Sequence, residues 1–110
     1  MHRRSIAAAI DAGVKIAMGT DSGVTPHGQY RRELFEMVNL VMSPADAFVA
    51  STRTASELMG LVQQIGTLEV GKVADVVCFA PAASGDPADL DVADLTDRVR
   101  RVIQSGVPVM

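Results

Sequence analysis

The sequence has little cysteine, few aromatic residues and no strong net charge, and each shortage excludes a class of protein. Its 110 residues include 1 cysteine, no tryptophan, 3 phenylalanines and 1 tyrosine. A lone cysteine, Cys78, cannot form an internal disulfide, which favours a cytoplasmic protein. So few aromatic side chains leave little surface on which nucleic-acid bases could stack. A net charge of −3 gives no overall attraction to phosphates. We therefore expect no nucleic-acid partner.

Long apolar runs are also missing, although the chain is far from hydrophilic. No stretch approaches the roughly 18–20 apolar residues of a membrane span, and Asp11 interrupts the apolar start of the chain too early for a signal peptide. We therefore expect no membrane partner. Hydrophobic residues make up 48% of the chain, which is too many for a disordered protein. A compact fold of this mass would expose about 5,800 Å² of surface and hold a modest core.

The spacing of apolar residues predicts helices in the first half of the chain and mainly β structure in the second. Helices are expected over 3–12, over 29–42, from Pro44 onward and over 54–59, with a short strand over 14–18 between the first two. Ser43 is a natural N-cap for the helix that starts at Pro44. A strand is expected over 74–79 and a hairpin over 98–110, with its turn at Ser105 and Gly106.

Two features of the second half predict which of its side chains are buried and which are exposed to solvent. The strand over 74–79 is apolar almost throughout, which predicts that both of its faces are covered and that Cys78 is a small core residue. An acidic, glycine-containing stretch over 85–97 is typical of a solvated loop. Three basic residues follow it and are expected to form a solvated face that balances these charges, rather than a nucleic-acid site: Arg98, Arg100 and Arg101.

The stretch after the first predicted strand is the most suggestive chemically. Asp21 lies in the run Gly-Thr-Asp-Ser-Gly, and His27 follows in the next loop. A carboxylate at the carboxyl end of a strand in an α/β sheet points into the crevice where such folds bind ligands. From spacing alone, Asp21 could equally be a turn residue and His27 a surface residue. The chain contains no His-x-His, His-Glu-x-x-His or Cys-x-x-Cys, so it holds no complete metal motif.

Four motifs in order resemble the metal-dependent amidohydrolase superfamily, in its imidazolonepropionase-like and Xaa-Pro-dipeptidase-like branch. The matching pieces are 16–34 (including Gly-Thr-Asp-Ser-Gly, Pro-His-Gly and Arg-Glu-Leu), 42–47 (Met-Ser-Pro-Ala-Asp-Ala), 50–60 and 65–77 (Ile-Gly-Thr-Leu-Glu-Val-Gly-Lys-Val-Ala-Asp-Val-Val). The resemblance implies an α/β fold, the C-terminal part of a (β/α)₈ TIM-type barrel plus strands of a small β-sandwich domain. Residues 1–60 would be the last helix-strand-helix portion of the barrel, and residues 61–110 the sandwich strands.

The same resemblance implies roles for individual residues. Asp21 matches the family's last-strand aspartate, which binds a catalytic divalent metal, usually zinc, and takes a proton from the attacking water. Ser22, His27 and Gly28 fall where the branch lines its substrate pocket. Gly66, Gly71, Lys72 and Asp75 fall where the family turns back into its sandwich, and we expect them to serve structure through positive φ angles and hydrogen bonds.

The implied function is hydrolysis of non-peptide or dipeptide C–N bonds in a small amide or dipeptide by metal-activated water. The family's other ligands, a His-x-His, a bridging carboxylated lysine or glutamate and two further histidines, come from strands that have no counterpart here. One carboxylate holds a catalytic metal poorly, so we expect no activity from the 110 residues alone. The alternative is a non-catalytic association module, or a split-enzyme half that completes a partner chain. The sequence identifies neither the substrate nor the number of metal ions.

Overall fold

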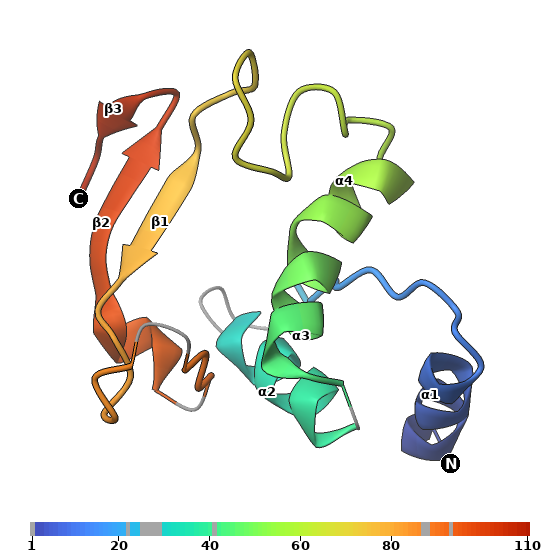
Figure 1. Cartoon of the computed structure of the whole chain (residues 1–110). Coiled ribbons are helices and arrows are strands. Elements are labelled where there is room, and N and C mark those ends of the chain that lie inside the picture. Colours follow the sequence, from blue (N-terminus) through green and yellow to red (C-terminus); the bar gives the residue numbers. More distant parts are fainter. Residues whose placement is uncertain (1, 22, 25–29, 41, 87–88, 93) are drawn as a thin grey trace.

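The computed structural model describes residues 2–21, 23–24, 30–40, 42–86, 89–92 and 94–110. Helices come first and a small sheet comes last, and Figure 1 shows the two groups side by side, joined by the long connection over residues 59–75. The helices are α1 (His2–Asp11), α2 (Tyr30–Asn39), α3 (Pro44–Ser51) and α4 (Arg53–Leu58). The strands are β1 (Val76–Phe79), β2 (Val99–Gln104) and β3 (Val107–Pro108), with the 3₁₀ helix η1 (Leu95–Arg98) before β2.

The core lies between α2, α3 and η1. Its buried residues are Leu34 and Met37 of α2, Ala47 and Ala50 of α3, and Leu95 of η1. The two alanines are 0% and 3% exposed. Because alanine side chains are small, neighbouring backbone can approach α3 closely at these two positions. Ser43 caps α3 as predicted, since its hydroxyl accepts a hydrogen bond from the amide of Asp46 at 3.1 Å.

The strand predicted over 14–18 does not form, and this prediction is wrong for the described chain. Residues 14–21 run extended after α1 and pass behind α3 and α4 in Figure 1. Ile16 and Met18 pack against the core, while Val14 is 55% exposed. A strand needs a neighbouring strand to bond to, and the paired strands of the described chain all lie in the C-terminal sheet. The apolar pattern therefore predicted correctly that this segment is extended and partly buried, but not whether it pairs with another strand.

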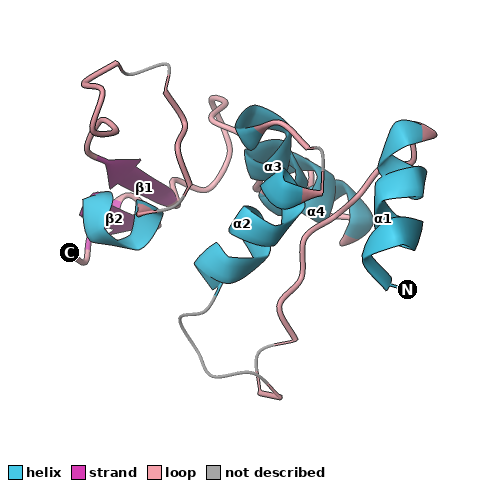
Figure 2. Cartoon of the chain, turned by 90° about the horizontal axis from the view of Figure 1, so that it is seen from below, coloured by secondary structure: helices cyan, strands magenta, loops and turns pink. Residues whose placement is uncertain are grey.

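The C-terminal sheet is antiparallel, in the order β1-β2-β3. Ser105 and Gly106, with φ angles of 50° and 80°, form the two-residue turn predicted between β2 and β3. The expectation that β1 is covered on both faces is wrong: Cys78 is exposed, and Val77 is 47% exposed. Contact with the helices is made at the end of β1, where the Phe79 and Phe48 rings lie 6.4 Å apart. Figure 2 shows the helices beside this sheet rather than across its faces.

Arg98 is buried, which corrects the prediction that it belongs to a solvated basic face. It is 8% exposed, whereas Arg100 and Arg101 are exposed. The Arg98 guanidinium donates to the carbonyl oxygens of Ala80, at 3.2 Å, and of Asp91. Its Nε lies 2.8 Å from Asp94 Oδ1, an ion pair whose angle is not that of a hydrogen bond. Arg98 therefore ties the acidic loop to the end of β1.

The loop over 66–72 has the structural role predicted for it. The Lys72 ammonium pairs with Glu69 at 2.6 Å and donates to the hydroxyl of Thr67. These two partners lower the pKa of Glu69, Lys72 more than Thr67. Asp75 Oδ1 accepts from the amide of Ser105 at 2.8 Å and so holds the β2–β3 turn. These contacts confirm that Lys72 and Asp75 fix backbone geometry by hydrogen bonding.

The chain exposes more surface than a compact fold of its size. Its accessible area is 7712 Å², roughly 1,900 Å² more than the scaling rule gives for this mass. Several apolar side chains contribute: Leu58 (79% exposed), Leu68 (84%) and Val70 (107%). The excess is more than twice the roughly 800 Å² that each partner buries in a standard protein interface. None of the described helices is long and apolar enough to cross a membrane.

Candidate functional site

Asp21 lies at the end of the extended segment and has an unusual backbone conformation. Its φ is 50°, in the left-handed region that few residues other than glycine adopt. Its carbonyl oxygen accepts from the amide of Val24 at 3.1 Å, which closes a turn. The residue is exposed in this chain. Aspartate adopts this region more readily than most non-glycine residues, and Ser105 has the same φ in the β2–β3 turn, so the angle is that of a turn.

The other residues predicted for the site cannot be placed beside Asp21. Ser22, His27 and Gly28 lie outside the described residues. Their predicted role in substrate binding therefore stays a prediction. Of the four residues predicted for the site, the described part of the chain includes Asp21 alone.

Two contacts fix the segment that carries Asp21. The amide of Met18 donates to the carbonyl of Ala50 at 3.1 Å, which binds the segment to the end of α3. The Lys15 ammonium pairs with Glu57 of α4 at 3.0 Å. Sequence reasoning missed both contacts, because neither a backbone carbonyl nor one exposed charge among many leaves a motif.

Glu57 carries a second ion pair, with Arg53 at 3.1 Å. The hydrogen bonds from Lys15 and then Arg53 lower the pKa of Glu57 below its ordinary value of 4.5. A carboxyl group with a lowered pKa contributes its stabilisation above its ordinary pKa and loses it as the pH falls through the lowered value. The contact between Lys15 and α4 is therefore intact at neutral pH and weakens only in acid.

The described residues do not hold a metal ion by themselves. They contain no group of three or more His, Cys, Asp or Glu side chains placed to bind one. A catalytic zinc takes about three protein ligands, and Asp21 offers one carboxylate. Any metal bound by Asp21 must therefore take its remaining ligands from groups outside the described set.

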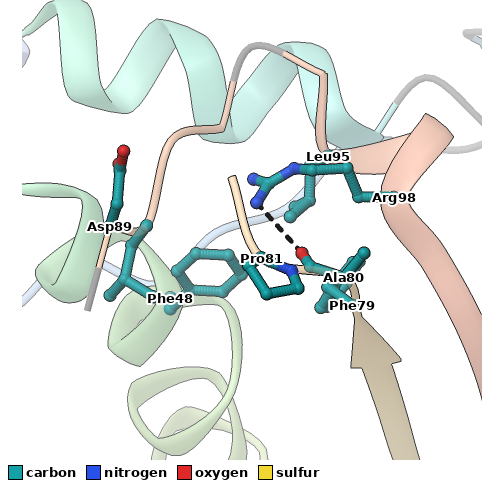
Figure 3. Close-up of a pocket in the computed structure, with 8 residues that line it drawn as sticks. Phe48, Phe79, Ala80, Pro81, Asp89, Leu95 and Arg98 are labelled. Atoms are coloured by element: carbon teal, nitrogen blue, oxygen red, sulfur yellow. Dashed lines mark hydrogen bonds between the residues drawn. The ribbon is translucent and has the colours of Figure 1, made fainter. Parts of the chain in front are cut away.

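A separate hollow of about 250 Å³ lies between α3 and the end of β1. Phe48, Phe79, Pro81 and Leu95 form its apolar wall, and Figure 3 shows Arg98 beside it, bonded to the Ala80 carbonyl. Asp21 is not among the described residues that line this hollow. The two charged side chains of its lining already have partners: Arg98 bonds to backbone carbonyls and pairs with Asp94, and the Asp89 carboxylate accepts from the Ser84 hydroxyl and the Asp91 amide.

The chain matches known proteins over nearly its whole length. A sequence profile described as "Amidohydrolase family" matches residues 1–109. The imidazolonepropionase of Pseudomonas fluorescens is 35% identical over 102 residues, which is 88% of this chain and 24% of that protein. The imidazolonepropionase of Geobacillus kaustophilus is 37% identical over 73 residues, covering 64% of this chain and 17% of that protein.

Solved structures with a similar fold come from the same group of enzymes. A Xaa-Pro dipeptidase with bound methionine in the active site superposes with a TM-score of 0.79 at 32% identity, over 96% of this chain and 25% of that one. An amidohydrolase from Thermotoga maritima superposes with a TM-score of 0.73 at 28% identity, over 98% of this chain and 26% of that one. The arrangement of helices and small sheet is therefore that of one segment of these enzymes.

The sequence match and the superpositions together define the class of protein to which this segment belongs. The chain belongs to the amidohydrolase family, which confirms the resemblance seen in its motifs. It spans about a quarter of the length of the relatives it matches.

Proposed function

We propose that the chain is the C-terminal portion of a metal-dependent amidohydrolase and that Asp21 is its contribution to catalysis. The observation that carries the proposal is the placement of Asp21. It ends a segment held in the core, it adopts a φ of 50°, and it lies within the run that matches the family. A carboxylate at the end of a segment held by Met18 and Lys15 has the fixed position that a metal ligand or a general base needs.

In this proposal Asp21 has two roles. It supplies one carboxylate ligand to a divalent metal, which members of this family generally use and which we expect to be zinc. It also accepts the proton of the attacking water and returns it to the leaving nitrogen of the cleaved C–N bond. Ser22, His27 and Gly28 follow Asp21 in the chain and are proposed to line the substrate pocket.

The same proposal assigns an architecture to the two halves. Residues 1–60 form the last helix-strand-helix portion of a (β/α)₈ barrel, and residues 61–110 form strands of a β-sandwich. The segment over 14–18 would become a strand when a neighbouring barrel strand supplies its hydrogen bonds. Its extended course and its buried Ile16 and Met18 side chains support this assignment.

The substrate is proposed to be a small amide or dipeptide. Imidazolonepropionases are the curated relatives given above, and a Xaa-Pro dipeptidase is a solved relative. Both names describe proteins that act on small molecules, which supports a small-molecule substrate for this chain.

The excess exposed surface favours a second proposal, that this chain works as part of a larger body. Roughly 1,900 Å² beyond the compact value and exposed apolar residues such as Leu68 indicate that this chain completes a larger body. That body is either the rest of one polypeptide or a complementing chain, as in a split enzyme. A non-catalytic association module would use the same surface without needing Asp21.

The proposal is tested by measuring the activity of two proteins. The first is the 110-residue chain alone. The second is a chimera, in which residues 1–110 replace the matching quarter of the Pseudomonas fluorescens imidazolonepropionase. We expect the 110-residue chain with added zinc to hydrolyse nothing measurable, because Asp21 supplies one of the roughly three protein ligands that a catalytic zinc takes. We expect the chimera to hydrolyse the parent enzyme's substrate.

Two outcomes would contradict this account. Zinc-dependent hydrolysis by the 110-residue chain, abolished by Asp21→Asn, would show that the site is complete without further ligands. A chimera that folds like the parent and binds zinc but has no activity would favour the association module.

A further inference from the structure

The break between α3 and α4 is where the segment carrying Asp21 is bound. α3 ends at Ser51 and α4 begins at Arg53, with Thr52 between them at φ −121° and ψ −84°. In an uninterrupted helix the carbonyl of Ala50 would accept from the amide four residues on, at Thr54. In this structure it accepts from Met18, three residues before Asp21. The break therefore frees the acceptor that holds the segment.

Two side chains account for the break. The hydroxyl of Ser51 donates to the carbonyl of Phe48 at 2.8 Å, and the hydroxyl of Thr52 donates to the same carbonyl at 2.7 Å. In a regular helix that carbonyl would accept from the amide of Thr52, which instead bonds to Val49 at 3.3 Å. Serine and threonine hydroxyls compete with backbone amides in this way and interrupt helices.

The hydrogen bond between Met18 and Ala50 lies where the extended segment packs closely against α3. Ala47 and Ala50 are buried and small, so the extended segment lies directly against α3. Thr52 is exposed and Ser51 is half-buried. Their side chains therefore contribute little to the core, and their evident effect is on the local path of the backbone.

We infer that the Ser51–Thr52 pair positions Asp21, by opening the helix so that the Ala50 carbonyl can bind the Met18 amide. Ser51 and Thr52 are positioning residues and touch no reacting atom. The local part of the inference rests on the hydrogen bonds of Ser51 and Thr52 to Phe48 and of Met18 to Ala50. That they matter for catalysis rests on the proposed function of Asp21.

The test compares the double variant Ser51→Ala, Thr52→Ala with two controls, Thr52→Ser and Thr54→Ala. Thr52→Ser keeps the hydroxyl, and Thr54→Ala makes the same change two residues further on, at a side chain with no bond to the Phe48 carbonyl. Amide hydrogen exchange of Met18, followed by NMR in the 110-residue chain, reports the bond directly. Circular dichroism at 222 nm reports the helix content.

We expect the double variant to gain helical signal while Met18 exchanges at least tenfold faster, and both controls to behave like the starting chain. A purely structural role would lose helix instead of gaining it. Unchanged Met18 exchange in the double variant would overturn the inference, and so would a loss of helical signal.

The same variants in the chimera separate this inference from the proposed function. We expect the double variant to lower kcat at least tenfold with unchanged zinc content, and Thr52→Ser, which keeps the hydroxyl, to retain the kcat of the unmodified chimera. If Asp21→Asn leaves the chimera active, the proposed role of Asp21 fails, while the exchange data still decide whether the pair holds the segment. Faster Met18 exchange with unchanged kcat in the chimera would overturn the link between the pair and catalysis.

Discussion

Asp21→Asn is expected to lower kcat of the chimera by about a thousandfold or more, in line with the roughly 10²–10⁴-fold contribution of a positioned general base and a further loss from weaker metal binding. Asparagine has almost the same shape as aspartate but can neither accept the proton nor supply the negative charge. Because the Asp21 side chain is exposed and no hydrogen bond to it is seen in the described chain, the fold should be unaffected. Steady-state kinetics with the parent enzyme's substrate measure the effect.

Asp46→Asn is a matched control, since Asp46 is an exposed aspartate in the first turn of α3. Its carboxylate accepts from the Ser43 hydroxyl at 2.6 Å, and asparagine keeps an oxygen that can accept this bond. Asp46→Asn should therefore leave kcat within about twofold of the unmodified chimera. Equal kcat values for Asp21→Asn and Asp46→Asn, in chimeras that both fold, would remove Asp21 from the mechanism.

Gly66→Ala is expected to have the largest effect on stability, a loss of about 3 kcal/mol or more from steric overlap combined with left-handed backbone strain. A Cβ atom at this position would lie 2.3 Å from Ser56 Oγ, 2.7 Å from Ser56 Cβ and 3.0 Å from the Thr52 carbonyl oxygen. Ser56 is 2% exposed, and its hydroxyl donates to the Arg53 carbonyl, so it has little room to move. Urea denaturation of the 110-residue chain gives the change in unfolding free energy.

Gly71→Ala separates the two causes. Gly71 has a φ of 92°, against 94° for Gly66, but no atom lies within 4 Å of the Cβ it would gain. It should therefore cost only the backbone strain, about 1–2 kcal/mol. Similar losses for the two variants would show that the contact with Ser56 is not the reason for glycine at position 66.

The parts of the fold that could be predicted from the sequence are those set by local chemistry. Ser43 and Pro44 predicted the start of α3 because capping depends on neighbouring residues alone. Ser105 and Gly106 predicted the hairpin turn because its φ angles require such residues. Position 66 was identified as a turn glycine, but its contact with Ser56 joins distant parts of the chain and left no local pattern.

The errors concern features that depend on partners far away in the sequence. The segment over 14–18 has the composition of a strand but lacks a neighbouring strand in the described chain. Arg98 resembles Arg100 and Arg101 in sequence, and only its bonds to the Ala80 and Asp91 carbonyls distinguish it. Cys78 is exposed because the helices reach β1 only near Phe79.

The candidate site was predicted from a family motif, and the roles of Asp21, Ser22, His27 and Gly28 stay predictions. The structure adds that Asp21 is exposed and closes a turn with Val24. The contact between Met18 and Ala50 joins two backbone groups, so no residue type could have indicated it.

Anomalous X-ray diffraction at the zinc edge, on crystals of the zinc-loaded chimera, tests the central claim most directly. If Asp21 is a metal ligand, the anomalous peak will lie about 2.0–2.2 Å from one of its carboxylate oxygens, the usual distance for carboxylate ligands of zinc. A fully ligated zinc bound only by residues of the parent enzyme, with the Asp21 side chain in solvent, would contradict the account.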